Sequence, residues 1–393
     1  MKTRLGFILI ALIAIASAHA QWSVEYMSTP RYDIRLARFA SGAVFVTDSW
    51  ERYDATNDLW SNGLLSDSRI GIAVAQAGTK AYFAGGKKGP FTDYVYVKSV
   101  DVYDDATHAW SKTTLSTARE VGGAGAIGTK VFFAGGRSAI QMWNTVDIFD
   151  TATGIRTKGK LSQARADIAV GAAGNQIVFA GGWYWDFNYN VLLSNAVDIY
   201  DSTTGLWTKT KLSQKRQAIS VASVGNKILF AGGLISTGTG ISKNVDIYDV
   251  STNTWTTMFL SIPRYGATAN VVGGKVYFAG SANGVSTVDV YDSATNGWST
   301  LTMPYQLAAM SGTVIKNQIF YAGGYVPATY AVSNIVQIYD TATGTWSVTN
   351  LSEARAGIAT ATFGDRAIFA GGATKVTYPA TGSATVDVYS FTP

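Results

Sequence analysis

Short hydrophobic runs separated by turn residues recur along this chain in a fixed order. In one clear copy the apolar runs Ile168–Ala172 and Gln176–Ala180 are followed by Val197–Tyr200 and by a run around Trp207. The runs are short and rich in β-branched or aromatic residues, and turn residues such as Thr204–Gly205 separate them. No run shows the 3.6-residue period of an amphipathic helix. The pattern predicts a four-stranded antiparallel meander for each copy.

The copy recurs eight times between residue 21 and residue 393, at a spacing of roughly 47 residues, and one such unit cannot bury its apolar face alone. The first run of each copy is rich in Ala and Gly, which suits strands crowded around a common axis, while aromatic residues fill the wider space between sheets. We therefore expect an all-β propeller of eight four-stranded blades. A solenoid is the alternative, but it needs modified capping repeats that neither terminus resembles.

The two ends of the chain complement each other. The last copy reaches Val386–Tyr389 and stops before a fourth strand, whereas Gln21–Val24 matches the fourth strand Thr345–Val348. We expect Trp22 to complete the last blade beside Tyr389, which would close the ring and remove two edge strands.

Residues 1–20 have the form of a secretory signal peptide. Lys2 and Arg4 precede the apolar run Leu5–Ala16, and Ala18-His19-Ala20 is an A-x-A cleavage site. The alternative is a membrane anchor, but the run is short for a bilayer. We expect cleavage after Ala20, a single domain over 21–393, a secreted or periplasmic protein and no membrane span.

Composition narrows the possible partners. The chain has no cysteine, so disulfides and a lipid-modified cysteine are excluded, which favours a bacterial source. Loss of Lys2 and Arg4 with the leader lowers the formal net charge of +5 by two. The remaining charges are spread along the repeats without a basic block, so we expect no nucleic-acid partner.

The repeated markers resemble the kelch motif, which combines a double glycine after the second strand, a Tyr-Asp pair and a following tryptophan. The resemblance covers residues 21–393 and implies a kelch β-propeller. Four copies depart from the pattern: the first has Thr47–Asp48 for the glycines, the third Ile155–Arg156 for the tryptophan, the sixth Gly280–Ser281, and the seventh Leu307 for an arginine. Seven blades is the alternative if the first copy is not a proper blade.

One arginine precedes the first strand of seven copies. If these strands line the axis, the guanidiniums would ring one mouth of the central channel. In kelch domains that bind acidic peptides, matching arginines contact the ligand, so the resemblance implies a ligand-binding role here. The alternative is that each arginine bonds backbone carbonyls of the neighbouring blade. The seven are Arg31, Arg69, Arg119, Arg165, Arg216, Arg264 and Arg355.

The segments after the glycines differ between copies, so specificity should lie there. The fourth copy carries Trp183, Tyr184 and Trp185, and the seventh carries Tyr325 and Tyr330. Such aromatic side chains suit stacking on sugars or anchoring a peptide. The alternative is that the segment folds over its neighbour and buries its rings.

Catalytic chemistry finds little support in the sequence. The Val-Asp-x-Tyr-Asp carboxylates, such as Asp198 and Asp201, recur in most copies, whereas a catalytic pair occurs once; we expect them to bond strand ends or turns. His108 lies in a predicted turn and His19 in the leader, so we expect no metal site and no cofactor.

We therefore expect a secreted, monomeric, non-catalytic propeller that binds a protein, peptide or glycan on its arginine-ringed loop face, with an anionic ligand as one alternative. The alternative is a sugar-processing enzyme resembling periplasmic kelch sialic-acid mutarotases. That activity would need an unrepeated carboxylate near the mouth, for which Glu120 and Glu353 are the candidates.

Overall fold

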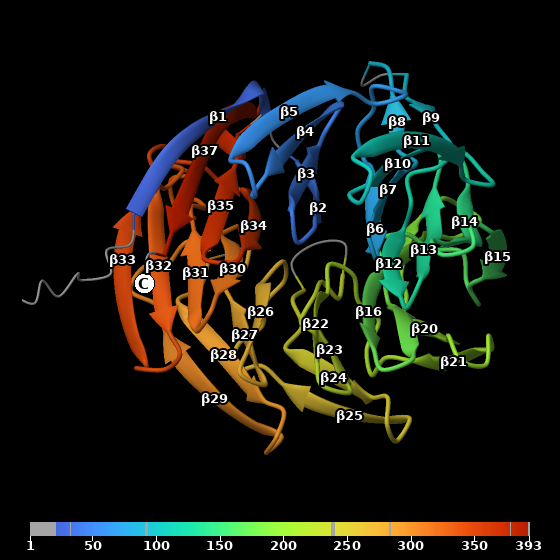
Figure 1. Ribbon diagram of the computed structural model, residues 1–393. Helices are drawn as coiled ribbons and strands as arrows, with labels where there is room; N and C mark the ends of the chain where they lie inside the picture. The colour runs from blue at the N-terminus through green and yellow to red at the C-terminus, as the bar shows by residue number, and fades with distance from the viewer. Residues whose placement is uncertain are drawn as a thin grey trace, which may run out of the picture.

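The computed structural model describes residues 21–31, 33–90, 93–236, 240–282, 284–377 and 379–391, so the predicted leader 1–20 and its cleavage site lie outside the described residues. Eight blades surround a central axis (Figure 1). Each blade is a meander whose strands follow one another outward from the axis. The eight-blade prediction is confirmed, and the first copy is a proper blade.

The innermost strands are short and rich in small residues, as expected for strands that crowd around the axis. They are β2 (Arg35–Arg38), β6 (Ala73–Ala77), β12 (Gly123–Ile127), β16 (Ala169–Ala173), β22 (Ser220–Val224), β26 (Thr268–Val272), β30 (Ser311–Ile315) and β34 (Ala359–Phe363).

The second strands are the most deeply buried. They are β3 (Gly42–Val46), β7 (Lys80–Ala84), β13 (Lys130–Arg137), β17 (Gln176–Ala180), β23 (Lys227–Ala231), β27 (Lys275–Ala279), β31 (Gln318–Ala322) and β35 (Arg366–Ala370).

The third strands carry the Val-Asp-x-Tyr-Asp residues, complete in four of the eight and with one or more substitutions in the others. They are β4 (Ser49–Asp54), β10 (Ser99–Asp104), β14 (Met142–Asp150), β20 (Ala196–Asp201), β24 (Asn244–Asp249), β28 (Thr287–Asp292), β32 (Ile335–Asp340) and β37 (Thr381–Ser390).

The outermost strands form the rim of the wheel and are mostly exposed. They are β5 (Leu59–Leu64), β11 (Ala109–Thr114), β15 (Arg156–Lys160), β21 (Trp207–Lys211), β25 (Thr254–Phe259), β29 (Gly297–Thr302), β33 (Thr345–Asn350) and β1 (Gln21–Arg31).

Three extensions rise from the segments between second and third strands. β8 (Lys87–Lys88) pairs with β9 (Val95–Tyr96), β18 (Trp183–Trp185) pairs with β19 (Val191–Leu193), and β36 (Ala373–Lys375) pairs with β37. We call the side of the wheel formed by these second-to-third-strand connections the loop face.

The ring closes as predicted. β1 pairs antiparallel with β37, with Trp22 opposite Tyr389, and their ring centroids lie 5.2 Å apart. A second link comes from the loop face, where the Gly372 amide donates to the Arg31 carbonyl at 3.0 Å. The two ends of the chain thus share one sheet at the rim, and a backbone bond ties the last blade to the segment that leads into the first.

Hydrophobic side chains fill the space between adjacent blades. The cluster between the third and fourth blades is representative, with Phe132, Ile148, Phe179 and Tyr200 buried and Trp207 packed against them. Equivalent clusters occupy every junction of the ring, including the closing one between Val388 and Phe45. Because the core lies between sheets, no blade holds its own core, and closure is part of stability.

Candidate functional site

The repeated arginines are the first candidate, and Arg119 shows how the fold places them. Its guanidinium donates to the carbonyls of Gly135 at 2.8 Å and Phe133 at 3.0 Å, and to the Asp147 carboxylate at 3.0 Å. Asp147 also accepts from the backbone and hydroxyl groups of Ser116 at 3.0 Å. The arginine therefore ties the lead-in segment to the second and third strands of one blade.

The other six arginines have equivalent surroundings. Each guanidinium is at most 4% exposed and forms an ion pair with an acidic side chain of the third strand. The expected open ring of guanidiniums at the channel mouth is therefore wrong, because the guanidiniums are buried in these ion pairs. Arg31 differs from the others in that it also lines a pocket of the loop face, described below. The carbonyls that they bond belong to their own blade, not to the neighbouring one. The pairs are Arg31–Glu51, Arg69–Asp101, Arg165–Asp198, Arg216–Asp246, Arg264–Asp289 and Arg355–Asp387.

The seventh blade shows that arginine and acid act as a unit. Leu307 stands where the arginine would be, and Gln337 stands where the third-strand carboxylate would be. Gln337 accepts from the Tyr305 amide at 2.7 Å, so it keeps the bond to the lead-in backbone without a charge. When the buried cation is absent the buried anion is absent too, as the high cost of an unpaired buried charge requires.

Burial governs the ionisation of these groups. It lowers the pKa of Arg119, whereas the charge and the hydrogen bond of Asp147 act in the opposite direction. An arginine starts from so high a pKa that it stays charged at neutral pH. The pair is therefore a buried, neutralised structural element.

The aspartate that ends seven of the eight third strands has a separate structural role. Asp201 accepts from the amides of Thr203 at 2.9 Å and Thr204 at 3.0 Å, which closes the turn before β21, and these bonds lower the pKa of Asp201. His108 sits in the equivalent turn of the second blade and bonds the Tyr103 hydroxyl at 2.9 Å. The expectation that these aspartates bond turns is confirmed.

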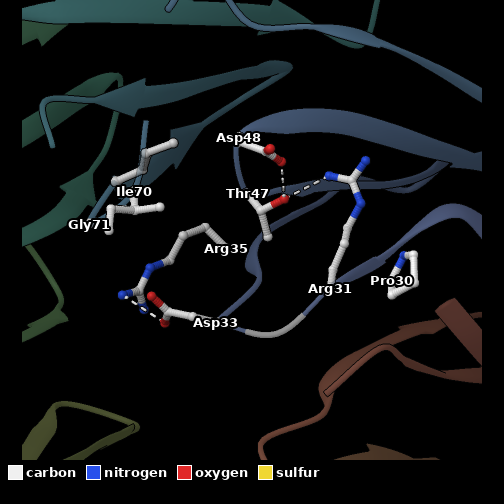
Figure 2. A pocket seen from close by; sticks show the side chains of 9 residues that line it. Pro30, Arg31, Asp33, Arg35, Thr47, Asp48, Ile70 and Gly71 are labelled. Carbon is white, nitrogen blue, oxygen red and sulfur yellow. Dashed lines mark hydrogen bonds and ion pairs between the residues drawn. The ribbon is translucent and has the colours of Figure 1, made fainter. Parts of the chain in front are cut away.

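The first blade leaves a notch in the loop face. Its second and third strands are joined by Thr47–Asp48 alone, where other blades carry a longer connection. A pocket of about 280 Å³ lies there (Figure 2), and Figure 2 shows the Thr47 hydroxyl joined to Arg31 and Asp48. Arg35, a solvent-open arginine, forms an ion pair with Asp33 at 3.1 Å in this pocket.

The notch leads into the mouth of the channel. A second pocket of about 520 Å³ shares Arg35 and Ile72 with the first and reaches Asp167 of the fourth blade. The Asp167 side chain is exposed on the wall of the channel. The surrounding protein nevertheless removes part of the water around its carboxylate, and this desolvation raises the pKa of Asp167. The mouth thus mixes one cation with carboxylates, which gives it no clear preference for an anion.

The fourth blade presents an aromatic hairpin on the loop face. In β18 and β19, Trp183 contacts Trp185 at 5.7 Å between ring centroids, and Trp185 contacts Tyr189 at 6.0 Å. Paired backbone bonds of 2.9 Å between Trp183 and Ala166 fix the base of the hairpin to its own blade. Arg137 of the third blade lies 5.8 Å from the Trp183 ring, so the base also packs on its neighbour.

The tip of this hairpin is held by hydrogen bonds and exposes two aromatic rings. Asp186 accepts from the amides of Asn188 and Asn190, both at 2.8 Å, and its pKa is lowered mainly by the Asn190 side chain and backbone. Phe187 is fully exposed and Tyr189 is 64% exposed. We call the segment 183–193 the aromatic hairpin.

Tyr325 does not join the aromatic hairpin. It lies in the seventh blade, three blades further round the ring, and stacks on Tyr330 with 5.8 Å between ring centroids. Its hydroxyl donates to the Ala282 carbonyl of the sixth blade at 3.1 Å. Tyr325 thus packs over its neighbour, while Tyr330 stays 58% exposed.

The carboxylates considered for catalysis have partners. Glu120 forms ion pairs with Lys87 at 2.9 Å and Arg137 at 3.0 Å. Glu353 accepts from the hydroxyls of Ser383 and Thr385. Among the described residues, no group of three His, Asp or Glu side chains is arranged to hold a metal ion, and no helix is long and apolar enough to cross a membrane.

Sequence reasoning missed two groups of residues on the surface. One is Arg35; the other is a set of lysines on the rim strands β15 and β21. The sequence held one signal for these residues: they occur in only one or two copies of the repeat, whereas the buried arginines occur in seven.

The match to a known protein family covers the fifth blade. Residues 215–258 match the model of the kelch motif, and this range holds β22, β23, β24 and nearly all of β25. No curated protein matches the chain.

Proposed function

Because this chain belongs to the kelch-repeat β-propellers, we propose that it is an exported, non-catalytic interaction protein that binds a protein partner through the aromatic hairpin of the loop face. The fold itself is consistent with a protein-binding role. The observation that carries the proposal is the fully exposed Phe187 ring at the tip of an ordered turn.

An aromatic ring exposed to water is unfavourable in free energy, and a partner that covers the ring removes this penalty. Phe187, Tyr189, Val191 and Leu192 are all exposed by at least 39%, and they lie together on one hairpin. Aromatic side chains on a rigid support lose little entropy on binding and dominate protein interfaces. Protruding aromatic rings suit a hydrophobic pocket on a partner better than they suit a sugar, which binds in concave sites.

The geometry disfavours the alternative enzyme. A mutarotase-like reaction at the mouth would need an arginine and a carboxylate that are open to an anionic sugar. The repeated arginines are buried, and Glu120 and Glu353 are engaged with other side chains. Arg35, the solvent-open arginine at the mouth, is already paired with Asp33 at 3.1 Å.

The test is a selection of displayed protein ligands on the wild-type propeller, followed by binding measurements on variants. Phe187→Ser/Tyr189→Ser should abolish binding of the selected ligands. The matched control Leu64→Ser/Phe259→Ser removes two exposed apolar side chains from rim strands and should leave binding intact. Ligands that bind the tip variant as well as the wild type would refute the proposal.

A further inference from the structure

The rim of the wheel is not uniform in charge. β15 carries Arg156, Lys158 and Lys160, and β21 carries Lys209 and Lys211, all exposed and without an acidic residue in either strand. The rim strands of other blades provide an internal comparison. β5, β25, β29 and β33 contain no charged residue.

Protection of exposed sheet edges does not explain this concentration. Lysines on edge strands do discourage pairing with other chains. However, the uncharged rim strands have the same exposed edge and manage without lysines. The cations are therefore a property of the third and fourth blades and not of the repeat.

A pocket lies beside the cations of β21, and it is lined by the fourth blade and by the segments that lead into and out of that blade. It has a volume of about 590 Å³, and Lys209, Lys211 and Lys215 contribute to its wall. In the described part of the chain, none of these three lysines forms an ion pair, and no acidic side chain lines the pocket. Asp198, the nearest third-strand carboxylate in register with Lys209, is buried and paired with Arg165.

The rest of the lining is polar but neutral. Gln163 and Asn195 contribute amides, and Tyr184 contributes an aromatic side chain. Tyr184 alternates along β18 with Trp183 and Trp185, so it belongs to the opposite face of the aromatic hairpin. Hydroxyl and amide groups beside an aromatic ring suit the hydroxyls and the apolar face of a sugar, and the lysines suit its negative charge.

The basic residues continue into the adjacent groove. Lys209 and Lys211 share a face of β21 with Trp207, which packs towards the third blade. Arg156, Lys158 and Lys160 share the corresponding face of β15, towards the second blade, where Arg156 reaches the Thr114 carbonyl. Alternate residues of a strand lie about 7 Å apart, so the cations form spaced rows in two neighbouring grooves.

We propose that this side of the rim binds an acidic polysaccharide, with one acidic sugar unit in the pocket formed by Lys209, Lys211, Lys215 and Tyr184. Spaced charges in two grooves suit a polymer with repeated negative charges better than a single small anion. The proposal does not depend on the aromatic hairpin tip, which lies at residues 186–190. It also reverses the expectation for an anionic ligand: the charge that would hold it lies on the rim and not at the mouth.

The test measures binding of a soluble polyuronate to the wild-type protein and to Lys209→Thr/Lys211→Thr. This variant gives β21 the residues that β29 carries in register, Thr300 and Thr302. Lys275→Thr/Lys316→Thr is the matched control, because it removes the same charge from exposed lysines elsewhere.

The wild type should bind the polyuronate, and the rim variant should bind at least about tenfold more weakly at 0.15 M salt, while the control should stay within about twofold of the wild type. Circular dichroism should show that both variants are folded. Absent binding by the wild type, or equal losses in the two variants, would overturn the proposal. Tighter binding of poly-glutamate or of single-stranded DNA than of the polyuronate would also overturn it, in favour of an acidic peptide or a nucleic acid.

Discussion

Exchanging one buried ion pair for the uncharged pair of the seventh blade tests the structural role of the repeated arginines. Arg119→Leu leaves Asp147 charged, buried and without its cation. Removal of one partner from a buried pair costs about 3–5 kcal/mol. Arg119→Leu/Asp147→Gln reproduces Leu307 and Gln337, in which the glutamine accepts from the lead-in amide without a charge.

The double variant should therefore be more stable than Arg119→Leu alone, with a loss of about 1–2 kcal/mol relative to the wild type. Urea unfolding followed by tryptophan fluorescence gives these free energies, provided that the slope with urea is the same for all variants. The Gly86 amide donates to the backbone carbonyl of Arg119 at 2.9 Å, and a side-chain substitution should leave this link between blades in place. A double variant as unstable as the sum of the two single variants would refute the account of a coupled pair.

Two further predictions concern the stability gained from ring closure and the loss of stability in acid. Trp22→Ala removes a half-buried ring that contacts Tyr389 and Phe369, and it should lower the free energy of unfolding by about 2–3 kcal/mol. Urea unfolding measures this loss, with Trp346→Ala as the comparison. A Trp22→Ala variant as stable as the wild type would contradict closure of the ring. Acid should destabilise the protein as the pH falls from about 4 towards 2, because hydrogen bonds hold the pKa of turn aspartates below the unfolded value. Burial opposes ionisation of Asp54, but bonds from Arg52, Thr56 and Asn57 outweigh it and lower its pKa to about 2. The stability from this carboxylate is thus present above its unfolded pKa and lost as the pH falls through the folded one; a thermal midpoint that stays constant from pH 5 to pH 2 would contradict this.

The fold was predictable because each copy confirms the others. The strand Gln176–Ala180 has the predicted bounds, and the pairing of Trp22 with Tyr389 follows from the missing fourth strand of the last copy. Internal alignment locates strands well, since every apolar run is seen eight times.

Burial of the arginines was harder to predict, because Arg119 and Asp147 lie 28 residues apart and sequence spacing gives no distance. One signal was available: the copy that has Leu307 for the arginine also has Gln337 for the aspartate. The basic rim was missed for a different reason. The cations of β15 and β21 alternate with neutral residues along each strand, so they form no continuous basic block in the sequence.

The central claim is that the repeated arginines build the wheel and are closed to ligands. Chemical modification of the native protein with an arginine-specific dicarbonyl, read by mass spectrometry, tests it directly. Arg35, Arg156 and Arg366 are open to solvent and should be modified in the native protein, whereas Arg119, Arg165 and Arg355 should react only after unfolding. Native-state modification of Arg119, Arg165 and Arg355 at the rate of Arg35 would contradict the account.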